Sequence, residues 1–545
     1  MSPQVPLSRK PLTKEALVNA NHLAAACGFL ALGISCASDP QGFELSNNAE
    51  VAVDNAPAAL RGWHERDKIE WAVCPEDFLE ECAWVPLPLV HDEAGGTALP
   101  IFVSRRLASS GHGDTQLWLL QGGPGGSANT FKDLIEQQLA PVMPNVDFYL
   151  LEQRGVGESA ALGCTLEESP DSEAGGAITG AEWPACIDAL KAQWGDRLAH
   201  FSTTDDAEDL ASLIRRTREP GKRVIVYGTS YGTLRAMRLL QTHPRAADGV
   251  VLDAIVAPGA QLSDYDMQWD PAARDLAALC DADPLCSAKL GPVAWEALST
   301  VVAQLNDAAF CAAFKGRFQL RQMSTLLLGH PVFRAHLFAL AYRLERCTQQ
   351  DVAVVQHYLD SLLTALPRLP SVRRTSQVLS NHIALSELWP NRAPSAQELG
   401  ERCASQTFCP GTSVGIGALY EQWPRYARDE YVGEWPSSRA PILAMHGTLD
   451  AAAPLASAEL AGVEFDGPHQ TFVTVPWSTH GVVYFSPVKT PGAPTCGIQM
   501  LASFVEDPKG VLDTACLRDL APVDFSGGDP ALVQQLFGTE DAWEN

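Results

Sequence analysis

The sequence predicts an α/β fold with a mostly parallel central sheet, helices on both of its faces and an inserted helical cap. Two observations lead to this prediction. In the first half of the chain, short apolar runs bounded by glycine and proline alternate with segments of helical periodicity. A long stretch rich in Ala and Leu then interrupts this alternation, and strand character resumes after it.

The strands expected before the interruption are short and largely apolar. A strand buried on both faces of a parallel sheet shows a continuous apolar run rather than an alternating one. The expected helix Gly232–Thr242 lies between the strands Arg223–Tyr227 and Val250–Val256, as a crossover between parallel neighbours requires. The expected strands are Trp84–Val90, Leu99–Val103, Leu117–Gln121, Val146–Leu151, Arg223–Tyr227 and Val250–Val256.

The interrupting stretch, residues 258–439, contains helical periodicity and no convincing strand. Its clearest helical patterns are Ala272–Cys280, Val293–Cys311 and Val352–Leu366. Strands return at Pro441–Met445 and Gln470–Val475. The sequence therefore predicts a core in two parts, residues 60–257 and 440–545, with a helical cap between them that covers the sheet.

The first 36 residues have the pattern of an export signal. Basic residues precede an apolar stretch, Leu23–Ile34, which is too short to span a bilayer as a stable helix. Small residues before Cys36 suggest a lipidated cysteine, although Leu32 lies one position too far upstream. A plain signal peptide and a disordered leader are the alternatives. Residues 37–59 are expected to be a linker. The leader predicts that the protein is periplasmic, a membrane-anchored lipoprotein or secreted.

The composition excludes one class of partner. The 545-residue chain has 65 acidic against 39 basic residues and a formal net charge of -26. A protein that binds nucleic acid needs a basic surface for the phosphate backbone, and this chain offers no sign of one. Solubility is the simplest interpretation of the acidity.

The 14 cysteines support export. Two lie in or at the end of the leader, and the other twelve form neighbouring couples, as an oxidising compartment permits. No couple has the C-x₂-C spacing of a zinc site and no H-E-x-x-H is present, so no metal is expected. The couples, whose pairing remains a hypothesis, are Cys74/Cys82, Cys164/Cys186, Cys280/Cys286, Cys311/Cys347, Cys403/Cys409 and Cys496/Cys516.

A G-x-S-x-G motif, Gly228–Gly232, stands between a predicted strand and a predicted helix. This is the context of the nucleophile elbow of the α/β-hydrolase fold, in which a sharp turn exposes a serine hydroxyl. The glycines are needed because side chains there would collide with the neighbouring strand or helix. The sequence therefore predicts Ser230 as the nucleophile; the alternative is a Gly-rich turn with a solvated serine.

A serine needs a base and an orienting acid, which follow it in the order acid, then histidine in this fold. Asp450 follows one late strand, and His480 follows the last strand. These two residues are expected to complete a catalytic triad. Asp253, at the end of the strand before the cap, is the second candidate for the acid. His446 is expected to support the end of its strand.

The Gly-rich segment Gln121–Ser127 follows an early strand. Such a loop brings backbone N–H groups close to a substrate carbonyl and forms an oxyanion hole. The amides of Gly123 and Tyr231 are the predicted donors, and Gly122 is expected to contact the substrate.

Together these segments resemble the prolyl iminopeptidase and tripeptidyl aminopeptidase family of α/β-hydrolase serine peptidases. The family's H-G-G-P-G is similar to Gln121–Gly125, and its D-Q-R-G-x-G-x-S to Glu152–Ser159. The segments Phe201–Asp206 and Gly228–Gly232 also fit, and the stretch around the last two cysteines resembles the exported tripeptidyl branch. The resemblance begins near Trp63 and is weakest in the cap.

The chain departs from the family pattern at two positions, with Gln121 in place of His and Glu152 in place of Asp. Neither change removes a member of the triad, but both could alter the pocket. The resemblance implies a peptidase that releases residues from peptide N-termini and needs no cofactor. An exopeptidase recognises a free amine, and Glu387 in the cap resembles a residue with that role; the alternative is a solvated glutamate at a helix end.

Two other functions remain compatible with the sequence. A carboxylesterase or small-molecule amidase would use the same machinery, because the fold does not determine the substrate. A non-catalytic surface protein could use the cap for binding. The expected partners are therefore a peptide or small-molecule substrate and, through Cys36, a lipid anchor in the membrane.

Overall fold

The computed structural model describes residues 68–91, 96–169, 171–172, 177–365 and 375–544, and its centre is a nine-stranded sheet. The order of strands in the sheet is β1-β2-β3-β5-β4-β6-β7-β8-β9. The strands are β1 (Ala72–Val73), β2 (Glu81–Pro88), β3 (Ala98–Arg106), β4 (Thr115–Leu120), β5 (Val146–Leu151), β6 (Arg223–Thr229), β7 (Gly249–Asp253), β8 (Ile442–Gly447) and β9 (Gln470–Val475).

The sheet is antiparallel at one side and parallel over the rest. β1, β2, β3 and β5 pair antiparallel in turn, whereas β5, β4, β6, β7, β8 and β9 are parallel neighbours. All eight predicted strands are present with shifts of a few residues at their ends. The short, exposed β1 was not predicted, because two residues leave no periodic pattern to detect.

Both faces of the sheet are covered, as predicted. Alternate residues of β4 enter different cores: Trp118 packs with helices on one face, and Leu117 packs with helices on the other. The first face is covered by α4 (Trp183–Trp194), α5 (Thr203–Thr217), α6 (Tyr231–Thr242), α16 (Leu455–Ala458) and α17 (Leu460–Glu464). The second is covered by α2 (Lys132–Leu134), α3 (Ala140–Val142), α18 (Val482–Phe485) and α19 (Cys496–Glu506).

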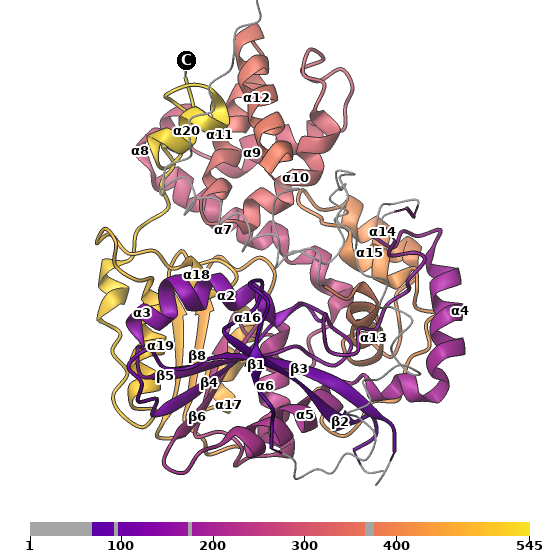
Figure 1. Cartoon of the computed structure of the whole chain (residues 1–545). Coiled ribbons are helices and arrows are strands. Elements are labelled where there is room, and N and C mark those ends of the chain that lie inside the picture. The colour runs from indigo at the N-terminus through magenta and orange to yellow at the C-terminus, as the bar shows by residue number, and fades with distance from the viewer. Residues whose placement is uncertain (1–67, 92–95, 170, 173–176, 366–374, 545) are drawn as a thin grey trace, which may run out of the picture.

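Between β7 and β8 the described chain contains helices and no strand, which agrees with the predicted cap. Figure 1 shows most of these helices above the sheet. The cap helices are α7 (Trp269–Ala282), α8 (Pro284–Leu290), α9 (Ala294–Gln304), α10 (Arg317–Gly329), α11 (Phe333–Arg346), α12 (Gln349–Ala365), α13 (Gln377–Glu387), α14 (Ala396–Ala404) and α15 (Thr412–Gly417).

The cap divides between two hydrophobic cores. Helices α7 to α12 build a core of their own, whereas α13 to α15 contribute side chains to the core of the sheet. The last helix, α20 (Pro530–Phe537), packs on α12 in the first of these cores (Figure 1). The indole Nε1 of Trp543 donates a 2.7 Å hydrogen bond to the carbonyl of Phe525 there. The C-terminal residues of the predicted second core part therefore pack with the cap helices.

One predicted cap helix is shorter in the structure. Helical periodicity suggested Val293–Cys311, but α9 ends at Gln304. The Asp307 carboxylate accepts the Ala309 amide at 2.8 Å and closes a turn there. An aspartate that bonds a nearby amide in this way favours a turn over continued helix.

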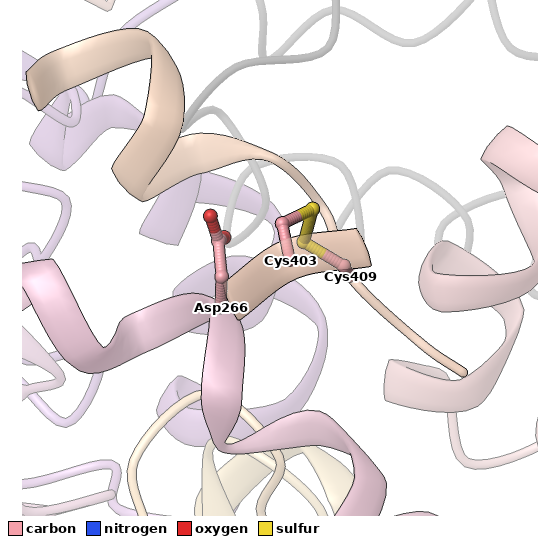
Figure 2. Close-up of side chains that lie close together, drawn as sticks. All are labelled: Asp266, Cys403 and Cys409. Carbon is pink, nitrogen blue, oxygen red and sulfur yellow. A yellow bond between two sulfur atoms is a disulfide. The ribbon is translucent and has the colours of Figure 1, made fainter. Parts of the chain in front are cut away.

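The structure joins all six predicted cysteine couples as disulfides, with Cα–Cα distances between 5.2 and 5.5 Å. Three of these bonds lie in the cap, including the Cys403–Cys409 bond in Figure 2. Among the described residues, no helix is long and apolar enough to cross a membrane. The leader, Cys36 and the linker lie outside the described residues.

A buried ion pair connects the loop after β5 with α5. Arg154 and Asp209 are both fully buried and form two hydrogen bonds, of 2.8 and 2.7 Å. Arg154 also donates to the carbonyls of Leu89 and His200. Burial alone would raise the pKa of the Asp209 carboxyl, but Arg154 and His91 hold it below its ordinary value. The pair therefore fixes three segments that are distant in sequence.

We expect Asp209→Asn to lower the free energy of unfolding by about 3 kcal/mol, because it removes the hydrogen-bonded counter-charge of the buried Arg154 and leaves only the more distant Asp205 carboxylate, 3.7 Å away. Urea denaturation of the purified protein measures this change. The matched control is Asp264→Asn, which breaks an exposed 2.9 Å pair with Arg402 and should cost less than about 1 kcal/mol. Equal losses for the two variants would contradict the structural role of Arg154 and Asp209.

Candidate active site

Ser230 lies at the turn between β6 and α6 with φ 56° and ψ −129°, a strained conformation for a residue with a side chain. Its amide donates to the carbonyl of Asp253 at 3.0 Å. The neighbouring glycines are required by contact: a Cβ on Gly228 would lie 2.2 Å from the Gly232 oxygen, and a Cβ on Gly232 would lie 2.3 Å from the Leu120 oxygen. The local structure is that expected of a nucleophile elbow.

Asp450 and His480 meet from the loops after β8 and β9. The Nδ1 atom of His480 lies 2.9 and 2.8 Å from the two carboxylate oxygens of Asp450, and both side chains are buried. The amides of Ala452 and Ala453 donate to the same carboxylate at 2.9 Å. The two loops also bond directly, because the Leu449 amide donates to the Ser478 carbonyl at 2.9 Å. The predicted acid and base therefore form a hydrogen-bonded pair.

The pair has complementary electrostatics. Burial alone would lower the pKa of His480, but the Asp450 carboxylate, followed by Asp253, raises it above its ordinary value. Burial alone would raise the pKa of Asp450, and the charge and hydrogen bond of His480 lower it. The arrangement stabilises the imidazolium that a general base becomes once it has accepted a proton.

The second candidate acid, Asp253, has a different role in the structure. Its carboxylate accepts the amides of Val482 and Val483 at 2.7 and 2.9 Å and the hydroxyl of Tyr227 at 2.7 Å. These bonds hold the segment that follows His480. His480 bonds to Asp450 instead, so the geometry favours Asp450 as the triad acid.

His446 has the supporting role expected from its position. Its Nδ1 accepts the Ile255 amide at 3.0 Å, and its Nε2 lies 3.0 Å from the Ala453 carbonyl. The ring therefore links the end of β8 with the segment after β7 and with the loop that carries Asp450. Burial lowers the pKa of His446, which favours the neutral ring in this position.

The Gly-rich loop after β4 lies against Ser230. A Cβ on Gly122 would stand 2.6 Å from the Cβ of Ser230 and 2.9 Å from the Thr229 carbonyl oxygen. Gly123 follows with φ 118°. Tyr231 is the first residue of α6, and amides in the first turn of a helix have no acceptor within the helix. The structure thus brings Gly122 beside Ser230 and sets Tyr231 at a helix N-terminus, as an oxyanion hole would require.

The two departures from the family pattern both support this loop. The Gln121 side chain accepts the Gly122 amide at 2.7 Å. Glu152, buried behind the loop, accepts the Ser127 hydroxyl at 2.5 Å and the Asn129 amide at 3.2 Å. Sequence reasoning did not assign either role, because the partners of Glu152 come from a different strand end.

Glu387 is buried at the C-terminal end of α13, so the alternative of a solvated glutamate is wrong. Its Oε1 accepts the Thr203 amide at 2.9 Å and the Tyr426 hydroxyl at 2.5 Å. Its Oε2 lies 3.7 Å from Nη2 of Arg238. The structure therefore gives Glu387 a packing role between the cap and α5, and substrate binding by Glu387 stays a prediction.

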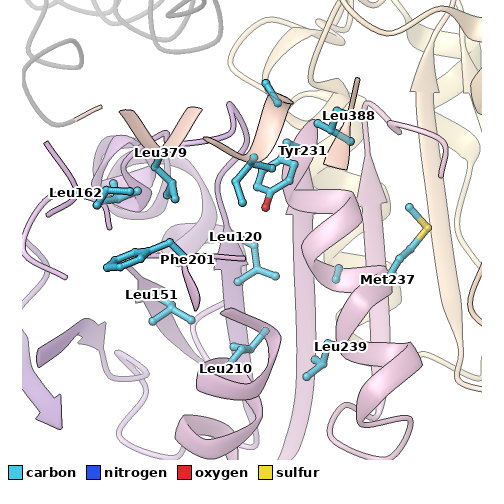
Figure 3. Close-up of a cluster of buried hydrophobic side chains, with 14 of the residues drawn as sticks. Leu120, Leu151, Leu162, Phe201, Leu210, Tyr231, Met237, Leu239, Leu379 and Leu388 are labelled. Carbon is cyan, nitrogen blue, oxygen red and sulfur yellow. The ribbon is translucent and has the colours of Figure 1, made fainter. Parts of the chain in front are cut away.

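The cap reaches the site through α13. Ser376, the N-cap of α13, donates its amide to the Gly125 carbonyl at 2.9 Å. Figure 3 shows Leu379 of α13 and Leu388 at its end in the same apolar cluster as Tyr231. The Gly-rich loop after β4 is therefore enclosed between Ser230 on one side and the cap helix α13 on the other.

Asp266 lies beside the Cys403–Cys409 disulfide (Figure 2), and their potential ligand atoms are within 4.8 Å of one another. The two sulfurs are bonded to each other. The Asp266 carboxylate accepts the amides of Thr412 and Ser413 at 2.9 and 3.0 Å. In the oxidised protein this group therefore positions the start of α15.

We expect Gly122→Ala to lower kcat by at least about 100-fold, the scale of losing an oxyanion-hole donor, because the new Cβ must displace the loop or Ser230. Turnover of the best substrate, normalised to circular dichroism and thermal melting, measures the effect. Gly415→Ala is the matched control, since the space around that exposed helical glycine is open. A Gly122→Ala enzyme with wild-type kcat would exclude the proposed loop geometry.

In the pH profile of kcat/KM, the acid limb should have its midpoint above pH 6.5, the ordinary pKa of histidine. The reason is that the pKa of His480 is raised and only the neutral imidazole can accept a proton. Activity is therefore lost as the pH falls through that midpoint. In Asp450→Asn the midpoint should move to lower pH while kcat falls about 10⁴-fold. A wild-type midpoint at or below 6.5 would contradict the assignment of His480 and Asp450.

A family model described as the alpha/beta hydrolase fold matches residues 117–281, from β4 through the elbow into the cap. No curated protein sequence matches the chain. A solved proline iminopeptidase from Mycobacterium smegmatis is 15% identical with a TM-score of 0.35, covering 78% of this chain and 99% of its own. A monoacylglycerol lipase from Paleococcus ferrophilus is 14% identical (TM-score 0.30, 75% and 98% covered). An esterase from Thermogutta terrifontis is 13% identical (TM-score 0.30, 73% and 91% covered). The family match establishes that this chain has the α/β-hydrolase fold.

Proposed function

We propose that the protein is a serine exopeptidase that releases residues, proline-type or tripeptide, from peptide N-termini. One observation carries the proposal of a hydrolase: the hydrogen-bonded pair of Asp450 and His480 lies on adjacent strand ends of a sheet whose elbow carries Ser230. The preference for peptides is supported by the resemblance of the oxyanion loop, Glu152–Ser159 and the elbow to the peptidase family.

In the proposed reaction, His480 accepts the hydroxyl proton of Ser230 as the oxygen attacks the scissile carbonyl. Asp450 accepts the Nδ1–H of His480, which leaves Nε2 as the base and fixes the ring. The amides of Gly123 and Tyr231 hold the oxyanion. His480 then protonates the leaving amine, and water releases the acyl group from Ser230 by the reverse sequence of proton transfers.

A carboxylesterase or small-molecule amidase is the alternative, since both use the same acyl-transfer chemistry. A peptidase of the proposed type needs a carboxylate for the substrate's amine, and Glu387 is the first candidate to test. The present contacts of Glu387 with Thr203 and Tyr426 favour a packing role. A non-catalytic binding protein is the other alternative, and it would leave the Ser230 hydroxyl unreactive.

We also propose that the protein is exported, either secreted, periplasmic or anchored through a lipid on Cys36. The six disulfides support this location, because such bonds persist in oxidising compartments and are rare in the cytosol. No cofactor or metal is part of the proposed chemistry.

The test is a panel of amides of proline, alanine and tripeptides with free N-termini, their N-blocked versions, and short-chain esters. The wild-type enzyme should cleave the free-amine peptides, and the best substrate gives the number of residues released. Fluorophosphonate labelling should modify Ser230. Ser230→Ala should abolish both turnover and labelling. Ester turnover without peptide cleavage would replace the peptidase proposal with an esterase, and absence of labelling would point to a binding protein.

Glu387→Gln serves as an arm of the same panel. If Glu387 binds the substrate's amine, this variant should lose kcat/KM on free-amine substrates while N-blocked substrates and esters are affected much less. A loss that is the same for all substrates, together with a lower melting temperature, would assign Glu387 to packing alone.

A further inference from the structure

Arg334 is a buried cation next to the loop that carries His480. It is the second residue of α11 in the cap, and only 4% of its surface is exposed. Its Nη2 donates a 2.7 Å hydrogen bond to the carbonyl of Trp477, three residues before His480. A positively charged cap residue therefore contacts the start of the loop that carries His480.

Arg334 differs from the other buried arginines of the described chain, because it has no carboxylate partner. Burial alone accounts for its pKa, which falls to about 9, so the side chain is still protonated at neutral pH. Its Nε and Nη1 are buried and have no hydrogen-bond acceptor among the described residues. The other four form ion pairs: Arg154 with Asp209, Arg235 with Asp206, Arg238 with Asp429 and Arg343 with Asp351.

This arrangement needs an explanation. A buried charge without a partner is strongly destabilising, and a chain with 65 acidic residues could have supplied one. The Trp477 bond uses one nitrogen and leaves the other two without acceptors. The N-terminal end of α11, with its partial positive charge, adds to the positive potential at this place. The site is therefore suited to an anion from outside the chain.

The position of Arg334 indicates which part of the substrate that anion belongs to. His480 gives its proton to the leaving group, so the leaving part of the substrate lies beside the His480 loop. Three residues of chain span at most about 11 Å, which places the Trp477 carbonyl within the length of a short extended peptide from His480. The guanidinium is thus within reach of the first residues beyond the scissile bond.

We propose that Arg334 is a specificity residue that binds a carboxylate on the leaving part of the substrate. The carboxylate is either the C-terminus of a short peptide or an acidic side chain just beyond the scissile bond. Because the Arg334 guanidinium is buried, salt would screen such an ion pair only weakly. The inference rests on the proposed function and adds to it a preference for anionic leaving groups.

The test compares peptides that share one N-terminal sequence. One ends in a free carboxylate, one in a carboxamide, and one in a carboxamide with an acidic side chain after the scissile bond. The wild type should prefer a carboxylate-bearing peptide over the plain amide in kcat/KM by roughly 10- to 100-fold, as expected for hydrogen bonds to a charged group. Whichever anionic peptide is preferred identifies the source of the carboxylate.

Arg334→Met should reduce this ratio to near 1, and Arg334→Lys should keep part of it. The matched control is Arg428→Met, which removes another cap arginine that donates only to backbone carbonyls, those of Ser386 and Trp389. This control should leave the ratio unchanged. Active-site titration of Ser230 with a fluorophosphonate corrects each variant for misfolded protein.

An unchanged ratio in Arg334→Met, or equal losses on all three peptides, would assign Arg334 to holding Trp477 and overturn the inference. A wild type that cleaves the three peptides equally would overturn it too, while the proposed exopeptidase function stands. If the wild type cleaves only esters, the proposed exopeptidase function fails, and this result alone does not overturn the anion site. In that case the same peptides are tested as inhibitors of ester turnover. Stronger inhibition of the wild type by the carboxylate-bearing peptides than by the plain amide, lost in Arg334→Met, would support the anion site, and equal inhibition would overturn it.

Discussion

Asp253 holds the candidate site together. Its backbone carbonyl accepts the Ser230 amide at 3.0 Å, and its buried carboxylate accepts the amides of Val482 and Val483 just after His480. One residue at the end of β7 thus connects the turn of Ser230 with the loop of His480. This is feasible because β6, β7, β8 and β9 are parallel neighbours, so their carboxyl ends meet at one edge of the sheet.

The two parts of the cap relate differently to this edge. α13 shares a core with the sheet and contacts the oxyanion loop through Ser376. Helices α7 to α12 have their own core, which meets the loops of Asp450 and His480 through Leu449, Ala451 and Trp477. The first part is integral to the domain that contains the sheet. The second part is packed separately, and the hydrogen bond from Arg334 to the Trp477 carbonyl connects it to the loop of His480.

The features that depend on short stretches of sequence could be predicted: the elbow, the strands and the loops that carry Asp450 and His480. A glycine on each side of Ser230 and a strand before it define the elbow, and strand order places Asp450 and His480. The bracing of the oxyanion loop by Glu152 and the ties made by Asp253 could not be predicted, because their partners are distant in sequence. The same holds for Glu387, whose burial depends on Thr203 of α5 and Tyr426 beyond α15. The packing of α20 against α12 was also missed, since an apolar helix face does not reveal which core it joins.

The disulfides also have a consequence for how the protein matures. Every bond in the described chain joins a cysteine to the next one along, across 6 to 36 residues. A chain threaded through a membrane with its N-terminus first would present each cysteine with its native partner as the next thiol to arrive. Oxidation in order of emergence would then give the native pairing, and this protein would have little need of an isomerase to shuffle its bonds.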